Sequence, residues 1–98
     1  MTIELTPFDT AKYLADPEDQ AELLTDAIAS GDTGIIAAAL GIVARAHGMT
    51  ELANETGLQR QALYRALSEK GNPTLETLLK ILPALGLELA ISPVKAAA

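Results

Sequence analysis

The sequence contains no cysteine and no tryptophan, and it has only one phenylalanine and two tyrosines among its 98 residues. Without cysteine the chain forms neither disulfides nor thiolate metal sites, which fits a reducing cytosol and predicts a cytoplasmic protein. Hydrophobic residues make up 49% of the chain and aromatic residues 3%, so the core must be aliphatic, a composition that favours helices. The length suffices for one domain.

Long apolar runs are also missing. The longest, residues 34–44, is well short of the about 20 residues that a membrane span needs, so we expect a buried helix there and no membrane association. The first residues, MTIELTPFD, lack the basic stretch and apolar run of a signal peptide. Glycine-rich phosphate loops and metal-ligand spacings are missing too, which predicts no cofactor, no metal and no catalytic residue.

The charge is unevenly distributed. The chain has 13 acidic and 7 basic residues, a formal net charge of −6, and all of this net charge belongs to residues 1–48, because the second half is neutral. Acidic residues on solvated helix faces would suffice to explain it. The functional alternative is an acidic surface that binds a basic protein.

Helix-capping residues and helix-breaking glycines divide the chain into helices. A short helix is expected from Asp9 to Leu14, and others begin after Asp16, after Asp32, at Thr50, at Leu58 or Gln59, and at Thr74. The last should bury Leu75, Leu78, Leu79 and Leu82 and end at Gly86. The helix over residues 33–47 has almost no polar face, which predicts a place in the core or at a subunit interface.

Two short segments alternate like strands, residues 3–6 and residues 87–92. A single strand is unstable alone, so the second must pair with the first or with its twin in another subunit. The fold class predicted is all-α, a bundle of five or six helices with short terminal β-strands. Residues 1–48 form an acidic helical region, residues 49–92 carry the second half of the domain, and 93–98 are a tail.

Residues 59–70 concentrate three of the seven basic residues on one helix-shaped stretch. At about 100° per residue, one side carries Arg60, Gln61, Tyr64, Arg65 and Ser68, and the other carries Ala62, Leu63, Ala66 and Leu67. Arginine pairs with two acceptors of guanine, and glutamine pairs with adenine, in the major groove of DNA. A solvated helix face is the plain alternative for the two arginines.

The residues before this helix favour a helix-turn-helix arrangement. Leu52 is apolar, Ala53 is small where two helices would cross, and Gly57 suits a tight turn four residues later. Leu58 and Leu63 follow at spacings that face back into the pair. In such an arrangement the second helix lies in the groove and its first turns contact bases.

Taken together, these motifs resemble those of known protein families. The stretch from Met49 to Leu87 resembles the lambda-repressor-like helix-turn-helix fold, including the Gly71-Asn72-Pro73 loop, and residues 8–91 together resemble the addiction-module antidote proteins, small antitoxins encoded beside RelE-like toxins. The resemblance implies a homodimer that binds double-stranded DNA, its own operator, and a RelE-like toxin.

The resemblance also implies roles for particular residues. The base-reading positions of the fold correspond to Arg60, Gln61 and Arg65. Contacts to the DNA backbone are expected from Gln59, Tyr64, Ser68, Lys70 and Asn72. Gln59 stands where the fold often has Ser or Thr, Tyr64 could instead pack on Leu67, and Asn72 could be a turn residue. The toxin is expected to contact Phe8, Tyr13, Glu18, Asp19 and Glu22, although Phe8 and Tyr13 also suit a core.

Three other functions are considered. A stand-alone repressor without a toxin would use the same DNA-binding surface. A protein-interaction module would use Arg60 and Arg65 to bind carboxylates. An enzyme is disfavoured because His47 is the one histidine and no Ser-His-Asp or Cys-His constellation exists; a histidine beside the helix-ending Gly48 more often interacts with the helix dipole.

Overall fold

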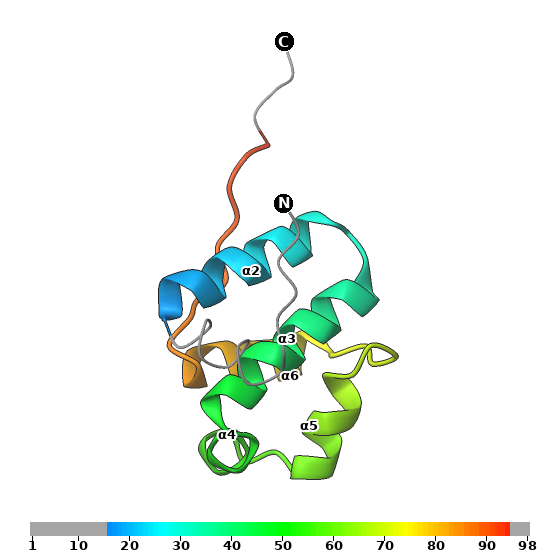
Figure 1. Ribbon diagram of the computed structural model, residues 1–98, viewed down its shortest axis with the longest axis vertical. Coiled ribbons are helices and arrows are strands. Elements are labelled where there is room, and N and C mark those ends of the chain that lie inside the picture. The colour runs from blue at the N-terminus through cyan, green and yellow to red at the C-terminus, as the bar shows by residue number, and fades with distance from the viewer. Residues whose placement is uncertain (1–15, 95–98) are drawn as a thin grey trace.

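The computed structural model describes residues 16–94, and the regular secondary structure of that range is entirely α-helical. The helices are α2 (Pro17–Ala29), α3 (Thr33–His47), α4 (Met49–Thr56), α5 (Arg60–Ala66) and α6 (Leu75–Ala84) (Figure 1). The all-α prediction is confirmed for this range. The helix expected from Asp9 to Leu14, the strand expected at 3–6, and the residues Phe8 and Tyr13 lie outside the described residues.

The predicted capping residues begin three of the helices. The Asp16 carboxylate accepts the N–H of Glu18 at 2.9 Å, and Asp32 accepts the N–H of Gly34 at 2.8 Å. At α6 the Thr74 hydroxyl oxygen accepts the N–H of Thr77 at 3.1 Å. Each of these contacts satisfies a backbone donor that has no partner within its helix. The boundaries of α2, α3 and α6 therefore follow from the sequence.

Helix α3 is the centre of the core. Leu40, Val43 and Ala44 are at most 1% exposed, and they pack in one cluster with Leu24 of α2 and Ile81 of α6. This confirms the core placement expected for residues 33–47. At Gly48, whose φ is 112°, the chain turns sharply, so that α3 and α4 lie at 98° to each other.

The α3–α4 junction also bears on membrane insertion. Among residues 16–94, no single helix is long and apolar enough to span a bilayer. Helices α3 and α4 together reach the required length and apolar composition, but the 98° bend separates them.

Residues 87–92 form no strand with any of the described residues. The two partners expected for them, residues 3–6 and a second subunit, lie outside the described range, so this strand stays a prediction. Two other expectations are wrong. Leu75 and Leu79 are 65% and 53% exposed, since α6 buries the side that carries Ile81 and Leu82. Ala62 is exposed, because the inward side of α5 is narrower than the one predicted at 100° per residue.

Candidate nucleic-acid interface

Helices α4 and α5 form a pair joined by the three-residue turn 57–59. Gly57 ends α4 in the left-handed conformation, with φ 75°, which confirms the tight turn expected there. Gln59, in an extended conformation, precedes the first residue of α5. Leu52 of α4 and Leu63 of α5 are at most 1% exposed, so the pair is anchored to the core on its inner side.

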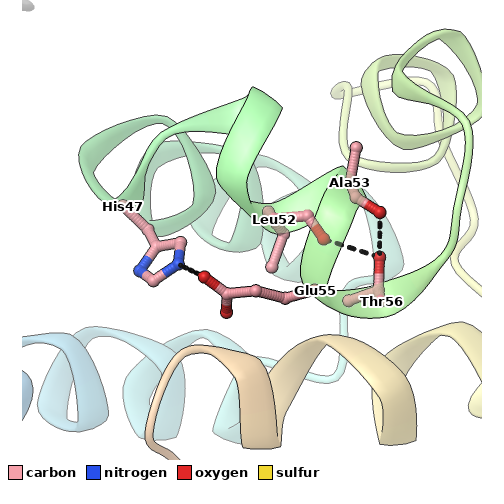
Figure 2. Close-up of polar contacts among 5 residues, drawn as sticks. All are labelled: His47, Leu52, Ala53, Glu55 and Thr56. Carbon is pink, nitrogen blue, oxygen red and sulfur yellow. Dashed lines mark hydrogen bonds and ion pairs between the residues drawn. The ribbon is translucent and has the colours of Figure 1, made fainter.

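Thr56 fixes the geometry of this turn. Its hydroxyl donates to the carbonyl of Leu52 at 2.7 Å (Figure 2). Its oxygen accepts the N–H of Leu58 at 3.3 Å. One side chain thus connects the last turn of α4 to the residue that leads into α5. The sequence analysis did not single out Thr56; a threonine immediately before a helix-ending glycine was the signal that could have found it.

The outer side of α5 presents the predicted side chains to solvent. Arg60, Gln61 and Arg65 are exposed, whereas Leu63 and Leu67 are each 1% exposed. The two sides of the helix therefore separate as the sequence predicts, apart from Ala62. Among residues 16–94, neither arginine forms an ion pair with a carboxylate.

The ring of Tyr64 contacts one of the two arginines on this surface. The guanidinium carbon of Arg60 lies 5.8 Å from the centre of the Tyr64 ring, within the range of a cation–π contact. Tyr64 is 42% exposed. The contact holds Arg60 against α5 and restricts the directions in which its guanidinium group points. It leaves Arg65, one turn further on, without this restraint.

Glycines let α3 and the loop after α5 approach closely. A Cβ at Gly41 would overlap the carbonyl oxygen of Leu67, and a Cβ at Gly71 would overlap the carbonyl oxygens of Ala66 and Arg65. At Gly34 the added atom would lie 3.1 Å from the carbonyl oxygen of Glu69. The contacts at Gly34 and Gly41 hold the residues after α5 against α3, and those at Gly71 hold the loop against the last turn of α5. Together they fix the direction of the exposed surface.

The residues expected at the DNA backbone flank this surface. Gln59 and Lys70 are exposed, and the Gln59 side chain makes no capping hydrogen bond. The Ser68 hydroxyl, just after α5, donates to the carbonyl of Arg65 at 3.0 Å, so its hydrogen-bond donor already has a partner in the last turn of α5. Asn72 is exposed beside the start of α6, where it lines a shallow hollow together with Pro73.

The acidic residues of α2 lie far from this surface. Glu18 and Glu22 are exposed one turn apart, and Asp19 is half-buried. Figure 1, drawn with the long axis of the molecule vertical, shows the α4–α5 pair at the lower end and α2 above it, with α3 and α6 between them. An acidic surface and a cationic surface are thus separated by the core.

His47 has a structural contact. Its Nε2 lies 3.1 Å from the Glu55 carboxylate, which connects the end of α3 to α4 (Figure 2). Among residues 16–94, no group of three or more His, Cys, Asp or Glu side chains is placed to hold a metal ion.

The fold and the site together define a class: a small helical protein in which two short helices, α4 and α5, are joined by a three-residue turn and the second exposes Arg60, Gln61 and Arg65. The chain belongs to the family described as "Probable addiction module antidote protein", which residues 4–93 match. The resemblance seen in the sequence is thereby confirmed at the level of the family. Because an antidote counteracts a toxin, membership implies an antitoxin with a toxin partner of some kind.

One relative, from Haemophilus influenzae, is described as an uncharacterized protein. It is 37% identical over 91 residues, which cover 93% of this chain and 94% of the relative. No solved structure matches the chain significantly. The family description therefore gives the general function, and the arguments for particular surfaces come from the geometry described above.

Proposed function

We propose that this antitoxin is a cytoplasmic, homodimeric, non-enzymatic autorepressor that reads its own operator through α5 and neutralises a RelE-like toxin. The observation that carries the DNA-binding part is the exposed row of Arg60, Gln61 and Arg65 directly after a fixed three-residue turn. These side chains have the donors that match guanine and adenine edges in the major groove. The α4–α5 pair resembles a lambda-repressor-like helix-turn-helix, whose second helix enters that groove.

The charge of the whole chain explains why two copies are needed. Arg60, Arg65 and Lys70 are the cationic groups around α5, in a protein of net charge −6. Affinity for DNA rises with the number of phosphates neutralised, so a single subunit would bind weakly. A two-fold dimer doubles the contacts and reads two half-sites about one turn of DNA apart. Gln59, Tyr64, Ser68 and Asn72 would then position α5 on the backbone.

A gel shift on the DNA upstream of the gene tests this part. Each good bidentate contact contributes about 1–3 kcal/mol, and a dimer makes it twice, so Arg65→Ala should weaken binding by at least about 30-fold. The matched control is Lys80→Ala, which removes one positive charge from α6, where Lys80 pairs with Glu76 at 3.4 Å. Equal retardation by Arg65→Ala and wild type would refute the assignment of α5.

The toxin-binding part of the proposal uses the acidic half of the chain. RNA-cutting toxins of the RelE-like class are basic, and complementary charge favours and steers such a complex. We assign this contact to the exposed carboxylates Glu18 and Glu22 and to Asp19 beside them. Tyr13, which precedes them in the sequence, belongs to the same assignment. Because α2 and α5 lie on opposite sides of the core, toxin and DNA could bind at the same time.

Charge reversal is the appropriate test, since α2 also supplies Leu24 and Ala27 to the core and cannot be deleted without unfolding the protein. The double variant Glu18→Lys/Glu22→Lys should lose the product of the neighbouring reading frame in co-purification. Its control reverses two exposed acids of the neutral half, Glu51 and Glu69. Retention of the toxin by the α2 variant would contradict this surface while leaving the DNA-binding proposal intact.

A further inference from the structure

Residues 87–91, which follow α6, alternate like a β-strand but pair with no other strand in the described part of the chain. Leu87, Leu89 and Ile91 alternate with Glu88 and Ala90. The N–H of Leu87 donates to the carbonyl of Leu82 at 2.9 Å, and beyond it no backbone hydrogen bond joins residues 88–92 to any other part of the range 16–94. An extended stretch with unpaired backbone groups is a template for pairing with another chain.

Apolar surface accompanies this segment. Ile91 is 95% exposed and Leu89 is 42% exposed. A groove of about 210 Å³ lies between the segment and helices α2, α3 and α6; its apolar lining includes Leu24, Ile28, Leu40, Leu78, Leu82 and Leu89. On α6, Leu75, Leu79 and Leu82 are spaced i, i+4 and i+7, so they lie along one side of the helix. Leu75 and Leu79 are exposed.

We propose that a second copy of this chain covers this surface, with residues 87–91 of the two copies paired as antiparallel strands about a two-fold axis at Leu89. The inference names the surface of the homodimer in the proposed function and does not depend on DNA or toxin binding. In this register Leu87 is opposite Ile91 of the partner subunit, and Leu89 is opposite Leu89 of the partner subunit. All the large apolar side chains then share one face.

The register also accounts for charge. Glu88 is placed opposite Ala90 of the partner subunit, so no two carboxylates face each other across the strands. Along residues 75–94 the charged residues are Glu76, Lys80 and Glu88, and the first two are paired at 3.4 Å. The near-neutral C-terminal surface is therefore where two chains of net charge −6 can approach with least repulsion.

The same arrangement covers the groove. Leu87 and Leu89 line it, and the paired strand would bring Ile91 of the partner subunit beside Leu87. Leu89 and Ile91 would thus be removed from water together. Pro93 has no N–H to donate, so the pairing ends naturally after Ile91.

The absence of cysteine makes the register testable on the full-length chain without background. Residues directly opposite each other in antiparallel strands have Cα atoms about 4.5–5.5 Å apart, within the range of about 4.4–6.8 Å that a disulfide requires. Leu89→Cys should therefore cross-link two subunits rapidly in oxidising buffer. Glu88→Cys is the matched control, because its twin is offset by two residues, or about 6.8 Å along the strand.

Mass measurement by light scattering, without DNA, completes the test. Wild type should have twice the chain mass of 10.2 kDa, and Leu89→Lys/Ile91→Lys should be monomeric with an unchanged helical circular dichroism spectrum, since both side chains are exposed. A monomeric wild type, a dimer that survives the double lysine variant, or cross-linking of Glu88→Cys or Ala90→Cys faster than Leu89→Cys would overturn the proposal. Pairing of residues 87–91 with residues 3–6 of the same chain would give the first of these results.

Discussion

Replacing Gly41 by alanine should destabilise this protein, although the same change stabilises most helices. In a helix interior alanine is favoured over glycine by about 1 kcal/mol. At Gly41, however, the added Cβ would overlap the carbonyl oxygen of Leu67 and lie 3.3 Å from the Arg45 guanidinium. The obstacle at Leu67 is a backbone atom, which cannot rotate away, so α3 and the end of α5 must separate.

The two contributions have opposite signs, and the second is larger. Overpacking a closely packed interior costs about 1–3 kcal/mol. After the gain in helix propensity, we expect a net loss of up to about 2 kcal/mol in the free energy of unfolding. For a chain of this length that lowers the midpoint of thermal unfolding by up to about 16 °C. The direction of the change is therefore diagnostic.

Thermal unfolding followed by far-ultraviolet circular dichroism measures the effect. Ala38→Gly in the same helix serves as the comparison, because it reports the size of the propensity contribution without a new contact. If Gly41→Ala unfolds at a higher temperature than wild type, the close approach of α3 to Leu67 is refuted. The position of α5 on the core would then require revision.

Three further predictions follow from the site and its supports. Thr56→Val should lower the free energy of unfolding by about 1 kcal/mol, because Leu58 loses its hydrogen-bond acceptor; chemical denaturation would show it, and an unchanged midpoint would mean that the turn holds without the hydroxyl. Asp32→Ala removes the cap of α3 and should cost about 0.5–2 kcal/mol in the same assay, whereas Asp26→Ala on the surface of α2 should change little. Tyr64→Leu should lower the free energy of unfolding by no more than about 1 kcal/mol, because the cation–π contact with Arg60 is worth about 0.5–1 kcal/mol at an exposed site. It should also reduce operator affinity several-fold, because Arg60 loses the restraint on its direction; unchanged affinity would mean that the contact does not position Arg60.

Local chemistry explains which parts of the fold are predictable from the sequence. Asp16, Asp32 and Thr74 begin helices because their side chains accept backbone N–H groups within three residues, and such short-range contacts are visible in the sequence. The end of α4 at Gly57 is predictable too, because glycine adopts the left-handed conformation that ends the helix. The exposure of Leu75 and Leu79 is not, because a leucine-rich helix offers several possible inward faces and tertiary packing selects one.

The candidate site divides in the same way. The exposed row of Arg60, Gln61 and Arg65 follows from the helical period, whereas the cation–π contact between Arg60 and Tyr64 depends on side-chain directions that spacing alone does not define. The strand pattern of residues 87–92 reflects a requirement for a partner rather than a structure of the single chain. The single chain accordingly leaves it unpaired within the described range.

The central claim is that the exposed side of α5 reads bases, and a specificity measurement tests it most directly. Affinities of wild type and Gln61→Ala would be measured by fluorescence anisotropy on the operator and on duplexes with single base-pair substitutions, at fixed salt. A lost base contact should relax discrimination by about 1–3 kcal/mol at one position of each half-site. Uniform weakening on every duplex, or no change on any, would contradict base reading by this helix.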